Sequence, residues 1–261
     1  MDKQFYPGLP VSIQRNPMGF IYGDGVFGPQ PERRKLDDIR NSLLDEQSEG
    51  PEVVYAIAMD VGKVEHKALL KQKMLLFGIV TYAAGKIGKE PVRSQGHIHA
   101  ISKHSGWSPP ELYEIWEGKA IVYMQETVED DPGRCYAIKA QAGDVVLVPP
   151  GWAHCTINAD PAILMTFGAW CDREYGYEYD RIRSNHGLAW YPIFTEDGNI
   201  RWQRNEHYST RELCYRQAEP CTKFGLDAGI PIYTQFERNP DKFQFVSNPE
   251  IWKENWKNFE P

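Results

Sequence analysis

The sequence has no long apolar run and no excess of positive charge. Its longest clean apolar run covers residues 74–80, far short of the ~20 residues that a membrane span needs. The N-terminus M-D-K-Q-F-Y-P-G-L-P has no basic segment followed by an apolar core, so we expect a soluble, unexported chain with no membrane partner. Twenty-nine basic against 36 acidic side chains give a net charge of −7, which predicts no nucleic-acid partner.

Cysteines are few, and their spacing forms no recognisable motif. The chain has 5 of them and no C-x-x-C pair, which argues against a disulfide framework and against a cysteine zinc site. We therefore expect reduced thiols in a cytoplasmic protein.

The composition that remains favours strands. Aromatic residues make up 13% of the chain, and 22 Gly with 19 Pro suit short strands joined by tight turns. Six β-prone runs follow one another without intervening helices, at residues 53–59, 74–83, 111–124, 135–139, 144–148 and 162–170. This order predicts an all-β sandwich or barrel.

We expect a single domain over residues 1–261. Its barrel core covers about residues 34–176, after an N-terminal arm over residues 1–33. Residues 177–261 form an aromatic-rich appendage that packs on the barrel, because they hold no separate core large enough for a second domain.

Helical signals are short and peripheral. Leu36, Ile39, Leu43 and Leu44 lie at helical spacing and predict one short amphipathic helix. Residues 209–212 resemble a capping box. A terminal helix is predicted at residues 249–259, with Trp252, Trp256 and Phe259 on one face as an aromatic stripe.

The strongest chemical signal is G-H-I-H at residues 96–99, followed by Glu111 and later by His154. Successive side chains of a strand alternate between its faces, so His97 and His99 point the same way. A lone histidine is more often a satisfied core or surface residue than a ligand. The H-x-H pair therefore needs further donors nearby to indicate a metal site.

A second segment, G-D-V-V-L-V-P-P-G-W-A-H-C-T-I-N at residues 143–158, supplies the next donor. Pro149, Pro150 and Gly151 force a turn between two strands, and the second strand begins near His154. Three imidazoles and the Glu111 carboxylate form a mixed nitrogen and oxygen set. Such a set suits a divalent first-row metal with coordination positions left open.

These segments resemble the two motifs of the cupin superfamily, G-x5-H-x-H-x3-4-E-x6-G and G-x5-P-x-G-x2-H-x3-N. The second motif is matched at all of its fixed positions, which are Gly143, Pro149, Gly151, His154 and Asn158. In the first motif, eleven residues rather than three or four separate His99 from Glu111, and the opening glycine is displaced to Gly88. We interpret residues 100–110 as an inserted loop.

Within that superfamily the chain resembles the cupin-type phosphoglucose isomerases. The resemblance is carried by four segments, G-K-I-G-K-E at residues 85–90, S-Q-G-H-I-H-A at 94–100, E-L-Y at 111–113 and V-P-P-G-W-A-H-C-T-I-N at 148–158. It implies a cupin double-stranded β-helix, or jelly-roll barrel, with a few peripheral helices. It also implies a cytoplasmic homodimer that interconverts glucose 6-phosphate and fructose 6-phosphate in glycolysis and gluconeogenesis.

Carried over by position, the resemblance implies four metal ligands, which are His97, His99, Glu111 and His154. It implies one divalent ion per chain, iron first, with manganese, zinc or nickel as alternatives. The sugar phosphate would be held near Tyr55, Ser94 and Gly96. A family threonine of the phosphate pocket falls on Val80, and Thr81 faces the other way if the strand is regular.

Positive charge near the site is expected to come from four side chains, which are Lys86, Lys89, Arg93 and His104. Together with a divalent ion they form a locally positive mouth for an anionic substrate, despite the acidic total charge. The alternative for each lysine is a solvated turn. We include Lys86 among the candidate substrate-binding residues.

The expected reaction moves a proton from C2 to C1 of the sugar and builds negative charge on O1 and O2, which a divalent ion stabilises. Glu111 is the candidate base as well as a ligand, and Tyr113 shares its face and can hydrogen-bond the base or the substrate. Strand parity places Glu114 on the opposite face, as a solvated or rim residue. A hydride shift between C2 and C1 would need no base, and the sequence does not separate the two routes.

Two other functions fit a cupin barrel. A metal-dependent oxygenase would use the same kind of ligand set. A non-catalytic sugar-binding cupin would keep the barrel without needing the four ligands. The barrel alone does not decide between them, since one fold hosts many chemistries.

Overall fold

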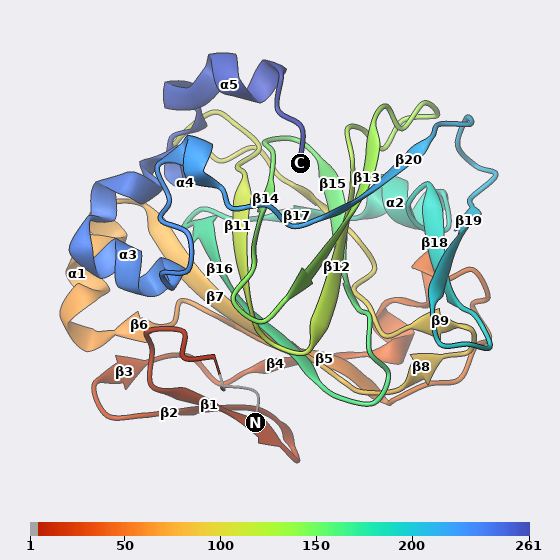
Figure 1. Cartoon of the computed structure of the whole chain (residues 1–261), viewed down its shortest axis with the longest axis horizontal. Helices are drawn as coiled ribbons and strands as arrows, with labels where there is room; N and C mark the ends of the chain where they lie inside the picture. The colour runs from red at the N-terminus through yellow and green to blue at the C-terminus, as the bar shows by residue number, and fades with distance from the viewer. Residues whose placement is uncertain (1–4) are drawn as a thin grey trace.

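The computed structural model describes residues 5–261, and the first four residues of the predicted N-terminal arm lie outside it. Two sheets form the barrel (Figure 1). The larger sheet contains, in spatial order, β14 (Val145–Val148), β11 (Glu111–Glu117), β16 (Met165–Asp172), β7 (Leu75–Tyr82), β5 (Val53–Met59) and β4 (Glu32–Lys35). The smaller sheet contains β15 (Ala153–Asn158), β12 (Lys119–Gln125), β13 (Cys135–Gln141) and β20 (Leu213–Gln217). The predicted all-β barrel is confirmed.

Short strand pairs and helices surround these sheets. The pairs are β1 (Val11–Arg15) with β2 (Met18–Tyr22), β3 (Val26–Phe27) with β6 (Gly62–Lys63), β8 (Lys86–Ile87) with β9 (Glu90–Pro91), β10 (Ile98–His99) with β17 (Tyr177–Glu178), and β18 (Trp190–Phe194) with β19 (Ile200–Arg204). The α-helices are α1 (Lys67–Gln72), α2 (Asp180–Ser184), α3 (Ile232–Arg238), α4 (Gln244–Ser247) and α5 (Lys253–Lys257). No helix within residues 5–261 is both long and apolar enough to cross a membrane.

Strand alternation decides which side chains enter the barrel. On β11, Tyr113 and Ile115 join the cluster between the two sheets, whereas Leu112 and Trp116 join a second cluster on the outer face. Every residue of β7 and β16 is buried, so these strands are covered on both faces. The inward face of the larger sheet is therefore available to build a site, while its outer face is an ordinary core.

The C-terminal helices cover that outer face. Helices α3 and α4 gather with α1 on one side of the barrel, next to β7 and β16 (Figure 1). The ring centroid of Trp170 on β16 lies 5.6 Å from that of Tyr233 and 4.6 Å from that of Phe236. Apolar burial of such large aromatic rings makes this contact a major source of stability.

Glu114 corrects one expectation. Parity does place it opposite Glu111, but it is 1% exposed rather than solvated. Its carboxylate accepts hydrogen bonds from the backbone N–H of Ile232, at 2.8 Å, and from Trp116 Nε1, at 3.1 Å. Burial raises the pKa of Glu114 to about 8, although these two bonds lower it. The sequence could not show this, because the burial comes from α3, more than a hundred residues later.

The raised pKa of Glu114 predicts that the protein loses stability as the pH rises. Between pH 4.5 and about 8 the folded protein retains a proton that the unfolded chain has released, so the free energy of unfolding falls by up to about 1.4 kcal/mol per pH unit. The Glu114→Gln variant cannot ionise, and its stability should depend less on pH over this window. Denaturant unfolding at a series of pH values tests this, and parallel curves for the two proteins would show that Glu114 does not titrate there.

Two predicted helical features are wrong. Residues 36–44 form two 3-10 turns, Leu36–Asp38 and Arg40–Ser42, instead of one amphipathic helix. Leu36, Ile39 and Leu43 still join the barrel core from these turns, whereas Leu44 is 38% exposed. The apparent capping box at residues 209–212 precedes strand β20, which pairs in parallel with the edge of β13. Pairing with a sheet edge has overridden the local signal there.

The predicted terminal helix is a 3-10 turn, Pro249–Trp252, that continues into α5. Its aromatic stripe is packed within the chain. The rings of Trp252, Trp256 and Phe259 lie 5.2, 5.0 and 5.5 Å from the ring of Phe224. Trp256 is 8% exposed and also donates a hydrogen bond from Nε1 to the carbonyl of Pro249.

Removal of this stripe should destabilise the protein. We expect Trp256→Ala to lower the free energy of unfolding by about 3 kcal/mol, since it empties a buried aromatic site and breaks a hydrogen bond. Ile251, which is 52% exposed, is the matched control, and Ile251→Ala should cost less than about 0.5 kcal/mol. Truncation after Pro249 should lower the melting temperature as well. Unchanged melting of the truncated chain would contradict the packing argument.

Candidate metal centre

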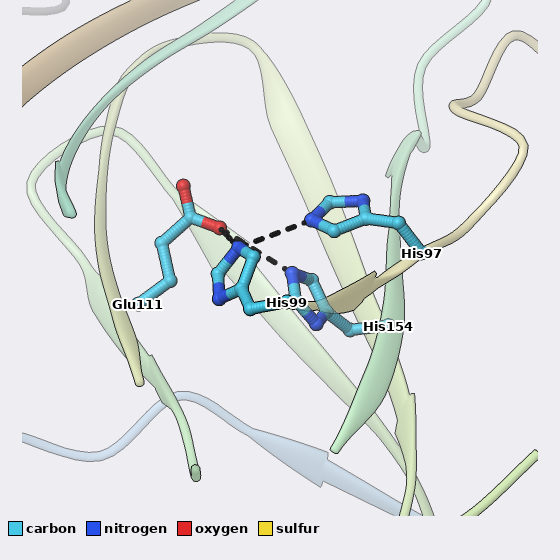
Figure 2. A group of neighbouring side chains, drawn as sticks. All are labelled: His97, His99, Glu111 and His154. Carbon is cyan, nitrogen blue, oxygen red and sulfur yellow. Dashed lines mark hydrogen bonds and ion pairs between the residues drawn. The ribbon is translucent and has the colours of Figure 1, made fainter. Parts of the chain in front are cut away.

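Three short backbone segments bring the candidate ligands together (Figure 2). His99 belongs to β10, Glu111 begins β11, and His154 lies near the start of β15. His97 precedes β10 and forms a bridge with His154, in which each backbone N–H donates to the other's carbonyl, at 3.0 and 2.9 Å. Ile98, between the two histidines, packs on the opposite side in the outer cluster of the smaller sheet, as alternation requires.

The four side chains point at one another across a small gap. One ligand atom from each of His97, His99, Glu111 and His154 lies within 4.8 Å of the others. The Nε2 atoms of His97 and His99 are 3.2 Å apart. Glu111 Oε2 lies 3.3 Å from His99 Nε2 and 3.3 Å from His154 Nε2. The inserted loop between His99 and Glu111 has therefore not separated the ligand set.

Backbone carbonyls orient two of the rings. His99 Nδ1 lies 2.8 Å from the carbonyl oxygen of Pro109, and His154 Nδ1 lies 3.0 Å from that of Trp152. An Nδ1–H that donates to a carbonyl leaves the Nε2 lone pair of a neutral imidazole free. The inserted loop thus contributes directly, because Pro109 belongs to it. Both Nε2 atoms face Glu111.

This donor set fits a cation. When His99 and His154 are neutral, their Nε2 lone pairs and the Glu111 carboxylate oxygen converge and repel one another, and a positive ion at that point removes the repulsion. Burial, with the neighbouring His154 and His99, holds the pKa of His97 well below its usual value, so His97 is neutral and ready to bind. Burial would raise the pKa of Glu111, but hydrogen bonds from His154 and His99 outweigh it and hold that pKa well below its usual range.

The Glu111 carboxylate has two further partners. The Tyr113 hydroxyl donates to Oε2 at 2.7 Å, and the Cys171 thiol donates to Oε1 at 3.1 Å. Tyr113 comes from the same inward face of β11, as predicted, and Cys171 comes from the neighbouring strand β16. These contacts fix the plane of the carboxylate relative to the imidazoles.

A cavity inside the barrel opens onto this cluster. Its lining includes His97 and Glu111 together with the candidate residues Tyr55, Ser94 and Tyr113. Val80 also lines the cavity, whereas Thr81 points outward and accepts a hydrogen bond from the Thr166 hydroxyl at 2.9 Å. The expected reversal of these two positions on β7 is confirmed. The cavity wall there is apolar where the resemblance implies a threonine.

The sequence model of the family described as Glucose-6-phosphate isomerase (GPI) matches residues 33–211. The chain belongs to this family. A glucose-6-phosphate isomerase of Pyrococcus abyssi is 32% identical over 206 residues, which cover 76% of this chain and 100% of the relative. One of Thermococcus gammatolerans is 31% identical over 186 residues, covering 67% of this chain and 86% of the relative.

Solved structures align less closely with this glucose-6-phosphate isomerase family member. A recombinant oxalate oxidase in complex with glycolate has a TM-score of 0.35 and 15% identity, over 46% of this chain and 51% of that chain. A hazelnut vicilin, from Corylus avellana, has a TM-score of 0.37 and 12% identity, over 59% of this chain and 36% of that chain.

The structure does not bring every candidate of this family member into the cavity. Lys86 is exposed, and its Nζ lies 4.8 Å above the ring of Phe194 on the outside of the barrel. Gly96 does not line the cavity; its φ of +89° and the closeness of Leu188, 2.9 Å from where a Cβ would stand, explain the glycine. Arg93 is buried, and its Nη2 lies 2.7 Å from Glu90 Oε2. Arg93 therefore does not contribute to the positive charge expected at the cavity opening, because Glu90 already neutralises it.

The lining residues missed by the sequence reasoning include Arg34, Tyr177 and Tyr179. Tyr177 pairs with His99 between β17 and β10, and its ring lies 4.6 Å from that of His97. The boundary expected at residue 177 thus runs through the site. The only available signal was the repeated tyrosine spacing in residues 175–179, Y-G-Y-E-Y, which places alternate side chains on one face of an extended segment.

Proposed function

We propose that this chain is a metal-dependent aldose–ketose isomerase that interconverts glucose 6-phosphate and fructose 6-phosphate. Family membership supports the isomerase over the oxygenase and the non-catalytic sugar-binding protein. The observation that carries the metal requirement is the convergence of three imidazoles and Glu111 Oε2 on one point beside the cavity. We assign one divalent ion to His97, His99, Glu111 and His154, iron first and manganese, zinc or nickel as alternatives.

When bound, the ion supplies a Lewis acid that stabilises negative charge on the substrate's O1 and O2. The chain's own residues do the rest. Oε2 of Glu111 faces the histidines, so we assign Oε1 of the same carboxylate as the base that takes the proton from C2 and returns it to C1. Tyr113 is the second catalytic residue, because its hydroxyl holds Glu111 Oε2 and lines the same cavity. We assign the substrate's phosphate to the part of the cavity formed by Tyr55 and Ser94.

A direct assay tests this function. Purified full-length protein, loaded with Mn²⁺ or Fe²⁺, is incubated with fructose 6-phosphate, and glucose 6-phosphate is followed. We expect product to accumulate with multiple turnovers. Substrate binding without product under every metal tested would favour a non-catalytic sugar-binding protein instead.

We also propose that residues 1–261 form one domain and that the protein is a cytoplasmic homodimer. The shared outer cluster of β16, α3 and α4 supports the single domain. One cooperative unfolding transition is expected, and light scattering should give twice the chain mass of 30.0 kDa. A mass of one chain would reject the dimer.

A further inference from the structure

Arg34 stands in a row of polar side chains along one wall of the cavity. It lies on β4, where it pairs in register with Tyr55 of β5, and Tyr55 pairs in turn with Tyr82 of β7. All three line the cavity. The rings of Tyr55 and Tyr82 are 5.1 Å apart, and the Arg34 guanidinium opposes the rise that burial causes in the pKa of Tyr55. Three adjacent strands, β4, β5 and β7, thus place hydrogen-bond donors at paired positions along one wall of the cavity.

The bonding of Arg34 is incomplete within the described residues. Its Nη2 lies 2.8 Å from Glu32 Oε1, whose side chain is 65% exposed, against 25% for that of Arg34. Its Nε is buried and has no hydrogen-bond partner among residues 5–261. A buried donor without a partner is costly, and here it belongs to a cation at the edge of a cavity. A ligand with several acceptor oxygens would satisfy it.

The charges around the cavity separate into two places. Among the described lining residues the carboxylate is that of Glu111, in the histidine cluster, and the permanently charged cation is Arg34. Tyr55, Tyr82, Ser94 and Thr156 add hydroxyl groups to the same lining, and Tyr55 pairs directly with Arg34. One fixed guanidinium among hydroxyl donors matches a phosphate, whose oxygens accept a forked pair of N–H bonds.

We propose that Arg34 binds the phosphate group of the sugar substrate and thereby makes the protein select phosphorylated over neutral sugars. This inference rests on the proposed function. In the larger sheet Arg34 and Glu111 stand on strands separated by β5, β7 and β16, and both line the same cavity. The substrate would therefore place the reacting C1 and C2 at the histidine cluster and C6 at Arg34. Glu32 is the competing anion that Arg34 exchanges for phosphate.

Variants of the metal-loaded full chain test this role. We expect Arg34→Gln to lower kcat/KM for fructose 6-phosphate about 30-fold, mainly through KM, and to weaken inhibition by inorganic phosphate to the same degree. Its turnover of unphosphorylated fructose and its metal content should match the wild type. Arg34→Lys should restore part of the loss. The matched control is Arg33→Gln, because Arg33 is exposed and its Nε bonds to the Met18 carbonyl instead.

Glu32→Gln supplies a test of opposite sign. Removal of the competing carboxylate should strengthen inhibition by inorganic phosphate about threefold, a change that a merely structural role of Arg34 would not produce. It also covers the case in which Arg34→Gln fails to fold, since Glu32 is exposed. Phosphate inhibition of Glu32→Gln or Arg34→Gln indistinguishable from that of Arg33→Gln would overturn the proposal.

A further measurement distinguishes failure of the proposed isomerase function from failure of the phosphate site at Arg34. If the wild type turns over no sugar phosphate with any divalent ion, that function fails, and equilibrium binding of inorganic phosphate is measured on the metal-free proteins. Weaker binding by Arg34→Gln than by Arg33→Gln would still support an anion site at Arg34. Equal binding, or none by the wild type, would reject it.

Discussion

Glu111→Gln is expected to lower the turnover of fructose 6-phosphate by about a thousandfold. The substitution keeps the size of the side chain but removes the negative charge that Oε2 presents to His99 and His154, each at 3.3 Å. It also removes the carboxylate that we assign to the C2 proton. Both losses act on the reaction itself, so kcat should fall far more than KM rises.

Glu114→Gln is the matched control for this experiment, because Glu114 lies three residues further along β11 on its outer face. It should retain turnover within about threefold of the wild type, after correction for any loss of folded protein. Elemental analysis of both variants separates a loss of metal from a loss of the base. Equal activity of the two variants would discard the assignment of Glu111 and the strand parity on which it depends.

Strand alternation explains why so much of this site could be predicted. Once β10, β11 and β15 are accepted as strands, the positions of His97, His99, Glu111 and His154 on the inward face follow from spacing. The reversal of Val80 and Thr81 on β7 follows from the same rule. Local turn chemistry at Pro149, Pro150 and Gly151 then fixes where β15 begins.

What could not be predicted depends on long-range packing. Arg34 and Tyr179 enter the cavity because β4 pairs with β5 and because residues 177–178 pair with β10. The tyrosine spacing of residues 175–179 predicts a shared face but not the pairing with β10, and the pairing of β4 with β5 has no local signal. The prediction that Glu114 is solvated was wrong for the same reason, since a side chain on the outer face of a strand reaches solvent only if no other element covers it. In residues 36–44 the buried side chains were predicted better than the backbone. Leu36, Ile39 and Leu43 are buried as their spacing predicts, but two 3-10 turns stand in place of the expected helix.

Removal of the metal is expected to abolish turnover, with activity at least about a thousandfold below that of the loaded protein. Chelation followed by elemental analysis provides the metal-free chain, and Mn²⁺ or Fe²⁺ should restore activity. His154→Ala removes one Nε2 donor from the cluster and should bind metal weakly and recover little. His186→Ala is its matched control, because His186 is exposed and lies 3.0 Å from Glu46 Oε1, apart from the cluster.

Metal binding itself is expected to depend on pH. The hydrogen bond and charge of Glu111 raise the pKa of His99 although burial lowers it, so His99 retains its proton to a higher pH than an ordinary histidine. Metal binding must displace that proton, and loading should therefore weaken as the pH falls. Calorimetry in buffers of different ionisation enthalpy measures the proton released. Full activity of a chain verified to be free of metal would show that the converging imidazoles serve the fold and not the reaction.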